Sequence, residues 1–169
     1  IWMVNVSGGT IAQTVVRRLY NATTSGSFNV KNSIVSLNTA GQVNAEVCGT
    51  FVCSGFNLIT IADGSTGFTQ PTDKTGTHDL PILASLDPNG LQDNGGPTQT
   101  VALLSGSLAI DAGTSAGLTG DLTTDQRGEG FSRSFDDPAV PNAAGGDGTD
   151  IGAVEAQTSL PLPARLGNI

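Results

Sequence analysis

Short runs of apolar and β-branched residues, each ended after a few positions by glycine, asparagine or serine, constrain the fold of this chain most strongly. Residues 1–7 alternate apolar and polar side chains, residues 11–20 are extended and β-branched, and residues 28–35 alternate again. Alternation is typical of strands, because successive side chains of a strand point to opposite faces. Glycine accounts for 23 of the 169 residues, whereas glutamate and lysine, which favour helices, are rare. The sequence therefore predicts an all-β fold of short strands and tight turns.

Residues 28–40 have the pattern of one coil of a stacked β-structure, and residues 47–51 together with residues 54–61 have the pattern of another. In such a structure each coil contributes short strands whose inward side chains stack on those of the next coil. Asparagine side chains at the corners can bond to the neighbouring coil. The internal repetition is too faint to give a period, so the residues alone leave the handedness of coiling open.

Three phrases in the C-terminal half each combine a short apolar group with a charged residue and a glycine. They are residues 94–113, which end in Ala-Ile-Asp-Ala-Gly, residues 124–128 (Thr-Asp-Gln-Arg-Gly) and residues 150–155 (Asp-Ile-Gly-Ala-Val-Glu). Neither a nucleophile–base pair nor a metal-ligand cluster accompanies them. We interpret the three phrases as a structural closure of the fold and not as a reaction centre.

Together with the strand pattern of residues 54–61, these phrases resemble the C-terminal module of secreted bacterial parallel β-helix proteins, the group often described as choice-of-anchor Q or CSLREA-type surface proteins. The resemblance extends from about Asn32 to Glu155. It implies a right-handed parallel β-helix with a loop-rich C-terminal closing module, at an extracellular or cell-surface location. We expect β-helix coils over residues 1–62, the closing module packed on them over residues 63–155, and an extended tail over residues 156–169.

Two arginines and several carboxylates lie beside the apolar groups of the C-terminal half. A planar guanidinium can hold a carboxylate through two parallel hydrogen bonds and satisfy nearby carbonyls as well. We therefore predict a structural latch that pins the long loop of residues 114–149. Its predicted members are Asp111, Asp125, Arg127, Arg133 and Glu155.

The same region is acidic and contributes most of the net charge of −8. An acidic surface repels phosphate backbones, so nucleic-acid binding is disfavoured. The acidic residues are consistent with a solvated surface or with a calcium site. A calcium site is considered because Ca²⁺ binds carboxylate and carbonyl oxygens in loops rich in aspartate, asparagine and glycine. Neither the EF-hand spacing nor a repeated nonapeptide calcium motif is present. The predicted calcium ligands are Asp121, Asp136, Asp147 and Asp150.

Cys48 and Cys53 are the only cysteines. A zinc site is disfavoured, because structural zinc takes four cysteine or histidine ligands. A disulfide that closes a small loop is the favoured interpretation, and two free thiols are the alternative. The disulfide would indicate an oxidising, extracytoplasmic compartment. No apolar run approaches the ~20 residues that a membrane-spanning helix needs.

Catalysis is not predicted. His78 is the only histidine, and its neighbour Asp79 would point to the opposite face of a strand. Pairs of carboxyl groups at the separations that glycosidases use arise by chance in acidic loops. We therefore expect a noncatalytic structural protein with no cofactor other than calcium. The alternatives are a carbohydrate-binding or adhesive module and, less favoured, a fragment of a polysaccharide lyase or hydrolase.

The N-terminal segment has no capping pattern of its own. It begins with strand-like residues, of which Ile1, Trp2, Val4 and Val6 are predicted to mediate self-association. An uncovered strand edge presents unpaired N–H and C=O groups to a partner. We expect either further coils removed from this chain or a second copy to cover it, and a head-to-tail contact between copies builds an open filament. The start at Ile1 without an initiator methionine is interpreted as a processed product or a fragment.

Overall fold

The computed structural model describes residues 3–5, 9–12, 15–16, 18–21, 28–37, 46–117 and 123–157. These residues form short strands and turns and include no helix, in agreement with the predicted all-β class. The strands are β1 (Met3–Asn5), β2 (Gly9–Ala12), β3 (Val15–Val16), β4 (Arg18–Tyr20), β5 (Phe28–Lys31), β6 (Ile34–Val35), β7 (Val47–Thr50), β8 (Val52–Cys53), β9 (Leu58–Ile59), β10 (Ser65–Thr66) and β11 (Lys74–Thr75).

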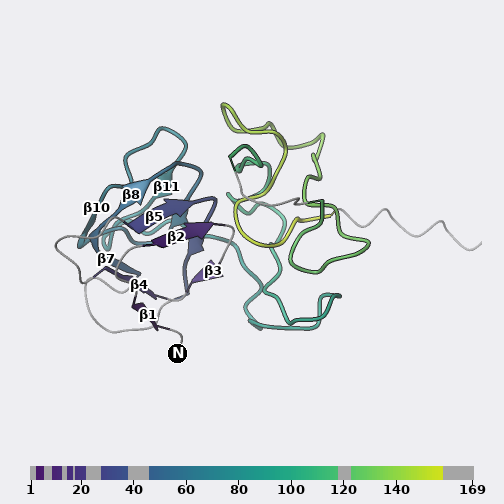
Figure 1. Ribbon diagram of the computed structural model, residues 1–169, viewed down its shortest axis with the longest axis horizontal. Coiled ribbons are helices and arrows are strands. Elements are labelled where there is room, and N and C mark those ends of the chain that lie inside the picture. The colour runs from purple at the N-terminus through teal and green to yellow at the C-terminus, as the bar shows by residue number, and fades with distance from the viewer. Residues whose placement is uncertain are drawn as a thin grey trace, which may run out of the picture.

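The strands form three parallel sheets, and the chain passes through the sheets in rotation (Figure 1). The first sheet has the order β1-β4-β7-β10, the second β2-β5-β8 and the third β11-β9-β6-β3. Strands that follow one another in sequence therefore lie in different sheets. We call β1–β3, β4–β6, β7–β9 and β10–β11 successive rounds of the chain, and each strand pairs with a strand of the preceding or following round. Antiparallel pairing among the described residues is limited to isolated bridges, which are Leu86–Leu103, Gln92–Thr100 and Thr124–Ser132.

The two middle strands of the third sheet, β6 and β9, are buried on both faces. Val35 and Ile59, which pair in register, point into the space between the sheets and pack in one core cluster. Their neighbours Ile34 and Leu58 also pair, but they point to the opposite face and belong to a second cluster. All four side chains have an exposed fraction of 0%. The usual alternation of buried and exposed residues is therefore lost in β6 and β9, because apolar groups cover both of their sides.

Polar side chains connect the rounds at the corner before the third sheet. The Asn57 side-chain oxygen accepts a hydrogen bond from the backbone N–H of Ser33 at 3.1 Å, and Asp73 accepts one from the N–H of Asn57 at 3.2 Å. Asn57 and Ser33 are equivalent positions, since they precede the paired residues Leu58 and Ile34. The predicted bonding of a corner asparagine to the neighbouring round is confirmed at Asn57.

Phenylalanine side chains stack at another corner. The ring centroids of Phe28 and Phe51 are 5.8 Å apart in an edge-to-face arrangement, and those of Phe51 and Phe68 are 5.2 Å apart. Gly67 makes this spacing possible, because its φ is +110° and a Cβ there would lie 2.0 Å from the carbonyl oxygen of Phe51. Glycine alone tolerates both the backbone angle and the close approach.

Residues 77–117 and 123–157 form a loop-rich part, here named the C-terminal lobe. It lies beside the sheets, on the side where β3 is seen (Figure 1). Its contact with the outward face of the third sheet is apolar, since Ala84, Leu86, Ala109, Ala112 and Ile151 pack in one cluster with Ile34 and Leu58. The lobe thus covers a flank of the sheets, not the end of the strand stack as a closing role had implied.

The predicted boundary after residue 62 requires correction. β10 and β11 lie beyond it, yet they pair with β7 and β9 and extend the first and third sheets. The sheets therefore continue to Thr75. β10 and β11 could not be recognised in the sequence, because two-residue strands between glycine, threonine and proline residues have the composition of a loop.

Candidate functional site

The densest polar cluster of the described residues lies in the C-terminal lobe and is built around two arginines. The Arg127 guanidinium donates to the Asp125 carboxylate through Nε at 3.0 Å and Nη2 at 2.6 Å. Nη2 also donates to the backbone oxygen of Glu155 at 2.7 Å. The Phe131 ring covers the guanidinium, whose carbon lies 3.9 Å from the ring centroid. A short turn sets this geometry, because Asp125 also accepts from the N–H of Arg127 at 2.7 Å.

The second arginine forms a buried ion pair. Arg133 donates to the Glu155 carboxylate through Nη1, and the two side chains are exposed by only 3% and 0%. Its Nη2 donates to the backbone oxygens of Asp150 and Gly152, both at 3.2 Å. The Glu155 carboxylate in turn accepts from the N–H of Asp150 at 3.1 Å. The pair therefore holds the turn of residues 150–155 against the strand-like segment around Arg133.

Asp150 and Asp111 complete the cluster. The Asp150 carboxylate accepts from the N–H of Asp111 at 2.8 Å and from that of Ala156 at 2.6 Å. The Asp111 carboxylate accepts from the N–H of Asp137 at 3.1 Å. The structure thus brings together all of the predicted latch residues, and Asp150, which was assigned to calcium, joins them. We keep the name latch for the set of Asp111, Asp125, Arg127, Arg133, Asp150 and Glu155.

Burial of the latch carboxylates raises the pKa of three of them. Burial raises the pKa of Asp150 to about 6, with a smaller contribution from the neighbouring Asp111 carboxylate. Burial also raises the pKa of Glu155, although the Arg133 guanidinium opposes the shift. The pKa of Asp111 is raised for the same reason. Every carboxylate of the latch accepts backbone N–H groups, so its oxygens are committed to holding loops together.

The raised pKa of Asp150 predicts a stability that falls as the pH rises. The folded state keeps this proton between about pH 4 and pH 6, where the unfolded chain has lost it, so the contribution is complete below pH 4 and is lost through pH 6. A shift of this size corresponds to about 2–3 kcal/mol. Urea denaturation between pH 4 and pH 6.5 should show the unfolding free energy falling, and Asp150→Asn should flatten the slope. A free energy that rises over this range would contradict the assignment.

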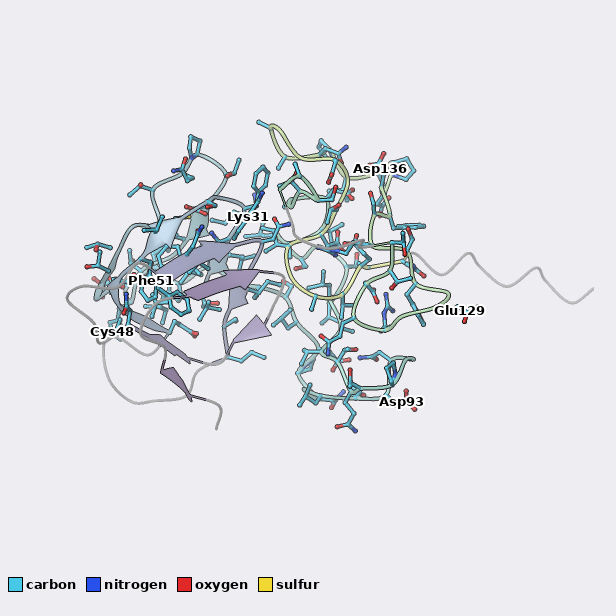
Figure 2. The ribbon with its side chains drawn as sticks, in the orientation of Figure 1. Lys31, Cys48, Phe51, Asp93, Glu129 and Asp136 are labelled. Atoms are coloured by element: carbon cyan, nitrogen blue, oxygen red, sulfur yellow. The ribbon has the colours of Figure 1, made fainter. Side chains whose placement is uncertain are left out.

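The predicted calcium ligands do not form one site among the described residues. Asp147 accepts from the N–H of Ser115 at 2.9 Å and Asp150 belongs to the latch, whereas Asp136 is exposed (Figure 2). Asp121 lies outside the described residues. Within the described ranges no group of three acidic, histidine or cysteine side chains is arranged to hold a metal ion. Calcium binding stays a prediction from the sequence.

The predicted Cys48–Cys53 disulfide is wrong for this structure, in which both residues are free thiols. The two residues lie in different sheets, because β7 and β8 are on opposite sides of the corner at Phe51. The Cys53 thiol instead donates to the Asp73 carboxylate at 2.9 Å. Burial, followed by the hydrogen bond to Asp73, raises the pKa of Cys53 to about 12. A sequence spacing that suited a closed loop could not reveal that a corner separates the two strands.

The other predicted positions are distributed over the molecule. His78 is exposed, and its backbone N–H donates to the Asp63 carboxylate. Of the predicted self-association residues, Val4 lies in β1 opposite Leu19, and Ile1, Trp2 and Val6 lie outside the described residues.

A contact between the sheets and the C-terminal lobe was missed by sequence reasoning. The Asn32 side chain both donates to the Thr114 carbonyl and accepts from the Thr114 N–H, the latter at 3.1 Å. Its φ of 47° is a conformation that asparagine tolerates better than most residues. An asparagine directly after a short strand pattern was the available signal, but its partner, far away in sequence, could not be read from it.

Comparison with protein-family models, curated proteins and solved structures gives no match to this chain. Over the described ranges, the structure holds no helix with the length and apolarity that a bilayer-crossing helix requires.

Proposed function

We propose that this chain is a noncatalytic structural protein, a subunit of a right-handed parallel β-solenoid that associates head-to-tail into an extracellular or cell-surface filament. The rotation of the chain through three parallel sheets supports a solenoid, because β1–β3, β4–β6 and β7–β9 each add one strand to each sheet in turn. The corner bonds of Asn57 and Asp73 support it further, since equivalent positions of successive rounds bond to one another.

A structural role is supported by how the charged groups are used. The latch carboxylates are buried and accept backbone N–H groups, and both latch arginines donate to backbone carbonyls. Groups held in this way connect segments of the chain and are closed to a substrate. The apolar cluster between the lobe and the third sheet likewise connects the lobe to the strands.

The proposal of self-association is based on the outer strand edge of the first round, formed by β1, β2 and β3. β1, β2 and β3 each pair with one strand, β4, β5 and β6, and no other described strand lies on their outer sides. Such an edge is a template for a further strand. We propose that a second copy supplies it.

The proposal is tested on the full chain by light scattering and negative-stain imaging over a range of concentrations. Because alternate residues of a parallel strand bond to alternate sides, one of Val4→Pro and Asn5→Pro removes an outward N–H of β1 and leaves its pairing with β4 intact. The variant with the unchanged melting temperature should associate less. A wild-type chain that stays monomeric up to millimolar concentration would refute self-association.

Carbohydrate binding is not proposed as a second function. Sugar-binding surfaces need accessible aromatic rings in a row, and none supports it among the described residues: Phe28 and Phe51 are buried, and Phe68, Phe56, Phe131 and Phe135 are only half-exposed. Carbohydrate binding stays a prediction from the sequence.

A further inference from the structure

The strand stack has a second edge at its opposite end, formed by β10 and β11. These strands are the last of the first and third sheets, in which β1 and β3 are the strands at the other end. Lys74 and Gly76 donate to the backbone oxygens of Asn57 and Ile59 at 2.7 and 3.0 Å. Residue 75 lies between them, so the N–H and C=O of Thr75 point away from β9. Thr75 and Thr66 of β10 are both exposed.

The second sheet ends differently. Its last strand is β8, because residues 67–73, which connect β10 to β11, form no strand. Phe68 of this segment packs against the core. This segment contains Pro71, which has no N–H to offer a further strand. Only the first and third sheets therefore present strand edges at this end.

An apolar side chain and two acids lie next to these edges. The turn that follows β11 is closed by a bond from the N–H of Thr77 to the Leu80 oxygen at 3.0 Å, and the Leu80 side chain is 78% exposed. Asp79 is exposed in the same turn, and Asp63 directly precedes the glycine before β10. We name β10, β11 and residues 77–80 the far-end surface.

Charge does not oppose contact between the two ends. The near end of the stack, formed by β1, β2 and β3, contains no charged residue. The far-end surface contains one acid, Asp79, and one base, Lys74, besides His78.

We propose that the far-end surface is the docking site for β1 and β3 of a second copy in the same orientation. This inference depends on the proposed self-association and adds which surface receives the partner. The first and third sheets then continue across the contact as parallel ladders, and Leu80 adds an apolar contact beside them. The contact uses different surfaces on the two copies, so it repeats without closing.

The direct test removes outward groups of the far-end surface. Thr75→Pro deletes an N–H that no described strand of its own chain uses, and Leu80→Asp replaces the exposed leucine. Each should weaken association about tenfold with an unchanged melting temperature, because a few hydrogen bonds or one apolar contact carry that free energy. The matched control is Leu91→Asp, a 62% exposed leucine of the C-terminal lobe, which should associate like the wild type. If Thr75→Pro and Leu80→Asp also associate like the wild type, the far-end surface is refuted and self-association itself stands.

Mixing separates head-to-tail from head-to-head contact. A chain blocked at the far end by Thr75→Pro combined with Leu80→Asp and a chain blocked at the near end in β1 should each associate far less than the wild type, and together they should form dimers that grow no further. Dimers formed by the far-end-blocked chain alone would indicate contact between two near ends and would refute the docking site.

Discussion

Arg133→Met should destabilise the protein by about 3–5 kcal/mol, because it leaves the Glu155 carboxylate buried without its guanidinium partner. The Arg133 side chain is 3% exposed and also donates to the Asp150 and Gly152 carbonyls, so its removal leaves several buried acceptors unpaired. Urea denaturation would measure the change in unfolding free energy. Hydrogen exchange would locate it, with loss of protection expected first over residues 150–155.

The control for this variant is the same change at the other latch arginine. Arg127→Met should cost about 1–3 kcal/mol, since the Asp125 carboxylate keeps the N–H groups of Arg127 and Glu155 as donors. In the double variant Arg133→Met with Glu155→Gln, the loss should be smaller than the sum of the single losses by about 0.5–3 kcal/mol, as expected for residues in contact. Strictly additive losses would mean that the two side chains do not interact.

Leu58→Ala should destabilise the protein by about 2–5 kcal/mol and loosen the lobe from the sheets. Leu58 is fully buried and belongs to the cluster that joins the outward face of the third sheet to Ala84, Ala109 and Ile151. The truncation leaves a cavity at this contact. Hydrogen exchange should therefore increase on both sides of it, in β9 and in the lobe.

A matched control exists in a neighbouring strand. Val52 of β8 is 49% exposed, and Val52→Ala should change the stability by less than about 0.5 kcal/mol. A small loss at Leu58, similar to that at Val52, would show that the lobe and the sheets are not joined through this cluster.

The fold class could be predicted from the sequence, but the strand pairing could not. Alternating residues such as Phe28 and Val30 indicate strands directly, because they are buried while Asn29 and Lys31 between and after them are not, which is the period of a strand. The partner of each strand depends on turns of unequal length. Ile34 pairs with Leu58, and Leu58 pairs with the much nearer Lys74, so no constant spacing reveals the rounds.

The latch was partly predictable for a chemical reason. Arginine and aspartate beside glycine in a loop indicate guanidinium–carboxylate pairs, and this signal identified Arg127, Arg133 and their partners. Asp150 was assigned to calcium, because a carboxylate that accepts backbone N–H groups and one that binds a cation look alike in the sequence. The disulfide prediction was wrong because a corner between two sheets separates Cys48 from Cys53, and the spacing of the two residues in the sequence cannot reveal that corner.

The C-terminal lobe occupies one flank of the strand stack, the outward face of the third sheet. Copies stacked end to end by translation would each present the lobe in a related direction, so that the lobes form a ridge along the fibre. Ligands or neighbouring fibres would then meet a ridged side that differs chemically from the sides formed by the first and second sheets.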